Sequence, residues 1–156
     1  MLRTLKLGRL AILLASAIPL AGCETLGGTG LIASSTTAEL TPQAATSIAG
    51  DMVGKLAERI GPGQNTIQLH ADGSLFGQAI ETSLRGLGYA VVTDQKAADA
   101  ANLIALAYVI DSFEGSVLAR LSTQNLELTR MYKPSPDGAT PTSPVSIMQR
   151  GLEKPQ

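Results

Sequence analysis

The chain has 156 residues, of which 44% are hydrophobic and 16% charged, and its net charge is −1 at pH 7. This near-neutral balance, with charges scattered along the chain, excludes both a nucleic-acid-binding surface and electrostatic recruitment to anionic lipid. The single cysteine excludes an intramolecular disulfide.

The first residues are typical of a secretory signal peptide. Arg3, Lys6 and Arg9 precede an apolar run from Leu10 to Leu20. A basic start, a short apolar core and small residues at its end predict a cleaved signal over residues 1–22. The apolar run is too short for a transmembrane helix, which needs about 20 apolar residues.

The end of this signal resembles a bacterial lipobox, formed by Leu20, Ala21, Gly22 and Cys23. The resemblance implies a diacylglycerol on the sulfur of Cys23 and an acyl chain on its amino group. Three acyl chains suffice for stable anchoring without crossing the membrane. Glu24 stands where Asp favours inner-membrane retention in enterobacterial lipoproteins, so we expect the outer membrane, with the protein facing the periplasm. The alternative is an ordinary signal peptide with a free thiol nearby.

The residues after Cys23 predict a flexible tether. Removing residues 1–22 leaves nine basic and thirteen acidic residues, a net charge of −4. The stretch 23–40 is rich in Gly, Ser and Thr, a composition that behaves as flexible coil. Its aliphatic side chains Leu26, Leu31 and Ile32 are either idle or anchors for a partner groove.

The first helix is predicted from Thr41, a favourable N-cap followed by Pro42, to a stop at Gly61. The apolar residues follow the helical repeat, and Asp51 and Lys55 are spaced to form an i, i+4 ion pair. Helical spacing brings one apolar stripe together, made of Ala45, Ile48, Ala49, Met52, Val53, Leu56, Ala57 and Ile60.

A strand, a helix and a second strand are expected next. Residues 66–70 alternate as a half-buried strand does, and residues 89–93 are the second strand. Between them Ser74 can cap a helix that places Phe76, Ile80, Leu84 and Leu87 on one stripe and stops at Gly86 and Gly88. If the two strands lie parallel in one sheet, this crossover is right-handed.

The remaining part of the domain predicts an antiparallel meander. Asp94 to Asn102 is a polar connection, with at most a helical turn. Residues 103–111 are apolar at both parities, which suggests a central strand covered on both faces, although a buried helix remains open. Turns at Glu114-Gly115 and Gln124-Asn125 separate the two further strands, 117–122 and 126–132.

The last residues, 133–156, predict an irregular tail because prolines recur at positions 134, 136, 141 and 144. A short helix from Ser143 to Arg150, either a frayed end or a docking peptide, is the one element expected there. The domain proper is therefore residues 41–132. Its predicted fold class is α+β, with two helices packed on a mixed, mostly antiparallel sheet of about five strands.

Few residues could carry catalysis or bind a metal. His70 is the only histidine, so no zinc ligand set remains once Cys23 is acylated. Ser74, His70 and Asp72 form no recognised nucleophile motif. The glycine pattern Gly50 to Lys55 departs from a phosphate-binding loop and lies inside the predicted helix. We therefore expect no enzyme activity, no cofactor and no small-molecule substrate.

Several blocks of the chain together carry a family resemblance. They are Ala38 to Gly88, with Ala49–Glu58 and Gly61–Gly63 within it, then Gly88–Thr93 and Leu118–Ser122. These blocks resemble the TrbH family of conjugal-transfer lipoproteins. The resemblance implies an outer-membrane lipoprotein of a type IV secretion (mating-pair formation) apparatus of plasmids and integrative elements, which anchors the envelope core complex. The implied partners are a β-rich periplasmic subunit and an envelope-spanning subunit.

Two rival functions remain open on sequence grounds. One is a stand-alone lipoprotein that faces the periplasm and regulates an envelope enzyme such as a cell-wall synthase. The other is a periplasmic hydrolase that depends on His70.

Overall fold

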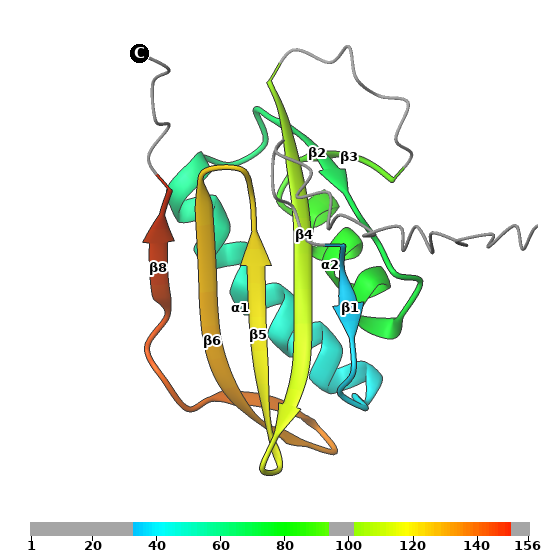
Figure 1. The fold of residues 1–156 in the computed structure, drawn as a ribbon. Coiled ribbons are helices and arrows are strands. Elements are labelled where there is room, and N and C mark those ends of the chain that lie inside the picture. The colour runs from blue at the N-terminus through cyan, green and yellow to red at the C-terminus, as the bar shows by residue number, and fades with distance from the viewer. Residues whose placement is uncertain (1–32, 94–101, 151–156) are drawn as a thin grey trace, which may run out of the picture.

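The computed structural model describes residues 33–93 and 102–150. Within these ranges, two helices pack on one face of a mixed sheet of eight strands (Figure 1). The predicted α+β class is confirmed, but the expectation of about five strands is wrong. Three strand pairings are parallel and four are antiparallel, so the sheet is less antiparallel than predicted.

The sheet runs in the order β3-β2-β4-β5-β6-β7, with β1 added beside β4 and β8 added beside β6. Its strands are β1 (Ser35–Thr36), β2 (Thr66–Leu69), β3 (Ala90–Val92), β4 (Leu103–Phe113), β5 (Ser116–Ser122), β6 (Leu126–Ser135), β7 (Gly138–Pro141) and β8 (Ser146–Gln149).

Helix α1 (Pro42–Ile60) begins and ends where the sequence predicts. The side chain of Thr41 accepts a hydrogen bond of 3.1 Å from the Ala44 N–H, which satisfies one free donor of the first turn. Gly61 closes the helix at φ 78°, a backbone conformation that glycine adopts without a Cβ clash, and donates to the Ala57 carbonyl. The predicted stripe is confirmed, its buried members being Ala45, Ile48, Ala49, Met52, Val53 and Leu56.

Helix α2 (Leu75–Gly86) forms the crossover between two parallel strands, β2 and β3, as predicted. The hydroxyl of Ser74 caps it by accepting a 3.0 Å hydrogen bond from the Gly77 N–H. Phe76, Ile80 and Leu84 are buried against α1 and the sheet, whereas Leu87 lies past the helix end and is 42% exposed.

Strand β4 is central, and two strands share one of its edges. β2 pairs with residues 103–106, and β1 pairs with Val109 and Ile110 farther along the same edge. Residues of one parity, such as Leu106 and Tyr108, face the helices and join the hydrophobic core. The two helices cover this face only (Figure 1), so the second covering predicted from the apolar pattern does not come from a described helix.

The C-terminal residues differ from their prediction. The short helix expected from Ser143 to Arg150 is wrong, because residues 146–149 form strand β8 beside β6. β6 itself continues through Pro134, and β7 pairs with that extension. The sheet tolerates Pro134 because β5 pairs with β6 only as far as Tyr132. The connection predicted around residues 94–101 lies outside the described residues.

Candidate functional site

The predicted lipidation site at Cys23 and its preceding residues Leu20, Ala21 and Gly22 lie outside the described residues. The described chain starts at residue 33 and enters the fold through β1, within the stretch predicted as a tether. The contacts of β1 are therefore the place where a pull on the N-terminus would reach the domain.

Strand β1 is short but is held by side chains as well as by its backbone. Ser34 Oγ accepts a 3.0 Å hydrogen bond from the Tyr108 N–H. Thr37 donates its N–H to the Ile110 carbonyl at 2.9 Å and its hydroxyl to Asp111 Oδ1 at 2.9 Å. These bonds fix the register in which Ser35 lies beside Val109.

A chain of polar groups joins β1 to the start of α2. Thr36 Oγ1 lies 3.0 Å from Ser74 Oγ, the cap of α2. Asp72 Oδ1 accepts hydrogen bonds from the Ser74 N–H at 3.0 Å and from the Tyr108 hydroxyl at 2.5 Å. The Tyr108 ring is fully buried and meets the Phe76 ring edge-on at 5.1 Å. We call Thr36, Asp72, Ser74 and Tyr108 the polar clasp.

The electrostatics of the polar clasp favour a charged Asp72 and a neutral Tyr108. Burial disfavours the Asp72 charge, but hydrogen bonds from Ser74 and Tyr108 outweigh that cost and lower its pKa to about 2. Burial, together with the nearby Asp72 carboxylate, raises the pKa of Tyr108 to about 12. The clasp therefore keeps one proton donor and one charged acceptor across the whole physiological pH range.

The same contacts show the structural roles of the candidate catalytic residues His70, Asp72 and Ser74. Ser74 Oγ caps α2, and the Asp72 carboxylate is bonded by Ser74 and Tyr108. His70 donates its backbone N–H to the Leu106 carbonyl at 3.0 Å, at the end of β2. The structure thus uses Asp72 and Ser74 to position β1 and α2.

A second tyrosine–aspartate pair fastens α1 to the sheet. Asp51 Oδ2 accepts hydrogen bonds from Arg130 at 2.7 Å and from the Tyr132 hydroxyl at 2.5 Å. The predicted Asp51–Lys55 pair is wrong, because Lys55 bonds Glu58 instead. Burial and the Asp51 charge raise the pKa of Tyr132. No local sequence signal identifies this role, because Arg130 and Tyr132 lie 79 and 81 residues from Asp51 along the chain.

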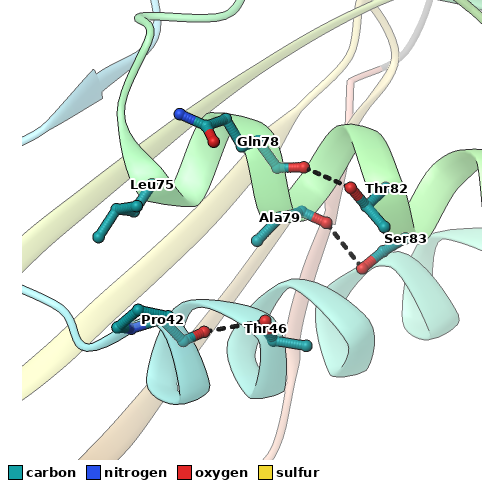
Figure 2. Close-up of a pocket in the computed structure, with 7 residues that line it drawn as sticks. All are labelled: Pro42, Thr46, Leu75, Gln78, Ala79, Thr82 and Ser83. Carbon is teal, nitrogen blue, oxygen red and sulfur yellow. Dashed lines mark hydrogen bonds between the residues drawn. The ribbon is translucent and has the colours of Figure 1, made fainter.

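An apolar hollow of about 700 Å³ lies on the face of the sheet that the helices leave open. Phe113, one of its lining residues, is 61% exposed. The hollow is lined by Thr37, Asp111, Ser112, Phe113, Leu118 and Met131. A smaller groove of about 240 Å³ lies between the two helices, where Thr46, Thr82 and Ser83 donate their hydroxyls to carbonyls of their own helices (Figure 2).

Comparison with known proteins assigns the family. The family described as "Conjugal transfer protein TrbH" matches residues 26–151. The chain belongs to the TrbH family. A relative from Sinorhizobium fredii (strain NBRC 101917 / NGR234), named "Probable conjugal transfer protein TrbH", is 48% identical over 135 residues, covering 84% of this chain and 90% of the relative. No solved structure matches the chain.

Residues 33–93 and 102–150 contain no group of three or more His, Cys, Asp or Glu placed to hold a metal ion. The helices within those same ranges are all too short or too polar to cross a membrane. The described part of this TrbH-family chain includes the polar clasp, the Asp51 contacts and the open sheet face.

Proposed function

We propose that the chain is a lipid-anchored, periplasm-facing component of a conjugative type IV secretion (mating-pair formation) apparatus, attached to the outer membrane. Membership of a conjugal transfer family supports the apparatus. The lipobox-like residues before Cys23 support the anchor. The same observations favour this function over regulation of an envelope enzyme, and we propose no catalytic role or cofactor.

The anchor would be strong for a simple physical reason. Each acyl methylene that enters the membrane contributes ~0.8 kcal/mol, so a diacylglycerol plus one further chain on Cys23 holds the protein permanently. The domain then has to withstand tension between the membrane and the secretion channel. β1 has only two paired residues, so the polar clasp and the Thr37–Asp111 bond carry much of that load.

The proposed partners are other subunits of the channel core, namely a β-rich periplasmic subunit and an envelope-spanning subunit. The apolar hollow lined by Leu118, Met131 and the exposed Phe113 is a surface available to them. Exposed aromatic and Met side chains are enriched where proteins bind each other. The core complex would be stabilised because this face is fixed to the membrane through β1.

The test separates export from lipidation. In one variant a cleavable, non-lipid signal peptide replaces residues 1–23 and releases the domain into the periplasm. In the matched control, the signal and cysteine of an unrelated lipoprotein replace the same residues. We expect the soluble form to leave the membrane fraction and to lower plasmid transfer by orders of magnitude, while the control restores transfer. Parental transfer by the soluble form would contradict the proposal.

A further inference from the structure

The open face of the sheet holds an arginine whose charge is only partly matched. Arg120 lies on β5, with Val109 beside it on β4 and Thr129 beside it on β6. Its chain neighbours Ala119 and Leu121 belong to the hydrophobic core that the helices cover, so alternation places Arg120 on the opposite, open face (Figure 1). Its side chain is 34% exposed, so a partner can reach it.

Two guanidinium groups on this face share one carboxylate. Glu127 Oε2 accepts a 2.7 Å hydrogen bond from Arg150. The other oxygen of Glu127, Oε1, lies 3.7 Å from Arg120 Nε, which is beyond hydrogen-bonding distance. The Nε of Arg120 is buried and has no hydrogen-bond partner among the described residues. A buried donor of a charged group is costly without an acceptor, so the surroundings of Arg120 favour a further carboxylate.

The apolar hollow begins next to Arg120. Leu118, two positions earlier on β5, lines the hollow together with Met131, its partner on β6. The carboxylate of Asp111, across from Leu118 on β4, accepts the Thr37 hydroxyl at 2.9 Å. Residues two positions apart on a strand share a face and are about 7 Å apart, so the hollow and the Arg120 guanidinium adjoin each other.

We propose that this face binds an extended segment of a channel subunit, in which an apolar side chain enters the hollow and an acidic side chain two residues away pairs with Arg120. The inference rests on the proposed function and specifies the chemistry of the partner. Side chains two residues apart in an extended segment point the same way and are about 7 Å apart, which matches the spacing of Leu118 and Arg120. The acidic side chain supplies the hydrogen-bond acceptor that the guanidinium lacks.

The composition of the face favours a protein segment over a lipid surface. Arg, Met and aromatic residues are enriched in protein interfaces, and Met131 and Phe113 line the hollow beside Arg120. An anionic membrane attracts clusters of basic residues, whereas the carboxylates of Glu127 and Asp111 lie on the same face as Arg120. One carboxylate placed next to one apolar side chain suits this mixed surface better than a layer of phosphates.

The first test is photo-crosslinking in donor cells that carry the full-length chain and the whole conjugation apparatus. The photoreactive residue p-benzoylphenylalanine replaces Phe113, which is exposed and lines the hollow. In the control it replaces Gln78, which is exposed on α2. Mass spectrometry identifies the crosslinked peptide. We expect position 113, but not position 78, to crosslink to a channel subunit, at a segment with an acidic residue two positions from an apolar one.

The second test reverses the charges. Arg120→Glu should lower both the crosslink yield and plasmid transfer about tenfold or more, and changing the acidic residue of the crosslinked segment to Arg should restore both. Arg120→Met, which keeps the aliphatic length and does not repel Glu127, should lower the crosslink yield as well. The matched control is Arg59→Glu, the same charge change at an exposed site on α1, and it should leave both readouts unchanged. Immunoblots compare the amounts of each variant.

Crosslinking of position 113 to a second copy of this chain, or to no protein at all, would overturn the proposal. So would a parental crosslink yield from Arg120→Met, or reversed charges that fail to restore an Arg120→Glu variant present at the parental amount. If deletion of the chain still abolishes transfer in these cases, the proposed function stands and this inference alone falls. If deletion leaves transfer unchanged, the proposed function fails and this inference fails with it.

Discussion

The hydroxyl of Tyr108, in the middle of the sheet, donates a 2.5 Å hydrogen bond to the carboxylate of Asp72, which lies 36 residues earlier just before α2. The same hydroxyl accepts the Asp72 backbone N–H at 3.1 Å. Through Ser74 and Thr36 this pair reaches β1, where the N-terminal segment joins the domain. A buried aromatic ring thus holds helix α2, strand β4 and strand β1 in one arrangement.

Acid should weaken this arrangement through Asp72. Its pKa is about 2 in the folded protein against 3.8 ordinarily. A lowered folded pKa contributes stability that is present above pH 4 and is lost as the pH falls from about 4 to about 2. Because Asp72 is exposed, solvent screening limits the contribution to about 1 kcal/mol.

The measurement is urea unfolding of the parent and of Asp72→Asn at a series of pH values. The variant should be less stable than the parent at pH 7, and the difference should shrink toward pH 2. A difference that stays constant between pH 7 and pH 2 would show that the Asp72 charge does not act in the clasp.

Two glycines in the helices should respond to alanine in opposite directions. At Gly77 a Cβ would lie 2.5 Å from the Tyr108 hydroxyl, which Asp72 holds in place, so Gly77→Ala should destabilise the fold by about 1–3 kcal/mol. At Gly50, which is exposed within α1, no described atom lies within 4 Å of the added Cβ. Gly50→Ala should therefore stabilise by up to about 1 kcal/mol.

Thermal unfolding of these two variants beside the parent gives the comparison directly. The account of the Tyr108 contact would be contradicted if Gly77→Ala melted at the parental temperature or above it.

The Asp51 contacts should matter far more than the ion pair next to them on the same helix. Asp51→Ala removes the partner of both Arg130 and Tyr132, which are largely buried, and should cost about 2 kcal/mol. Lys55→Ala removes an exposed pair with Glu58 and should cost less than about 0.5 kcal/mol. Denaturant unfolding measures both effects. If Asp51→Ala and Lys55→Ala lowered the free energy of unfolding equally, the difference in burial between the two pairs would not determine their contributions.

The helices and the main strands could be predicted from the sequence because their signals are local. Thr41 with Pro42, Ser74 and Gly61 each mark a helix end through the chemistry of their own backbone. β1 carries no such signal, since two residues in a Ser/Thr run become a strand only because the edge of β4 is free beside them. The sequence does not predict β7 and β8, because the recurring prolines in this region argue against strands. Edge strands nevertheless tolerate proline.

The candidate site also has one part that adjacent residues reveal and one part that depends on residues far apart in the sequence. The lipobox-like residues before Cys23 can be identified from neighbouring letters alone. The polar clasp joins residues up to 74 positions apart when the Ser34 bond to β4 is included. The sequence pairs Asp51 with Lys55 because only neighbours on the same helix can be recognised in a sequence, whereas the partners of Asp51 come from β6.

The attachment of lipid to Cys23 is tested most directly by mass spectrometry of the protein purified from donor-cell membranes. The account predicts that the mature chain starts at Cys23 and that its N-terminal peptide carries a diacylglycerol and one further acyl chain. An N-terminal peptide with a free thiol at Cys23 would contradict it, whatever the transfer phenotype of the cells.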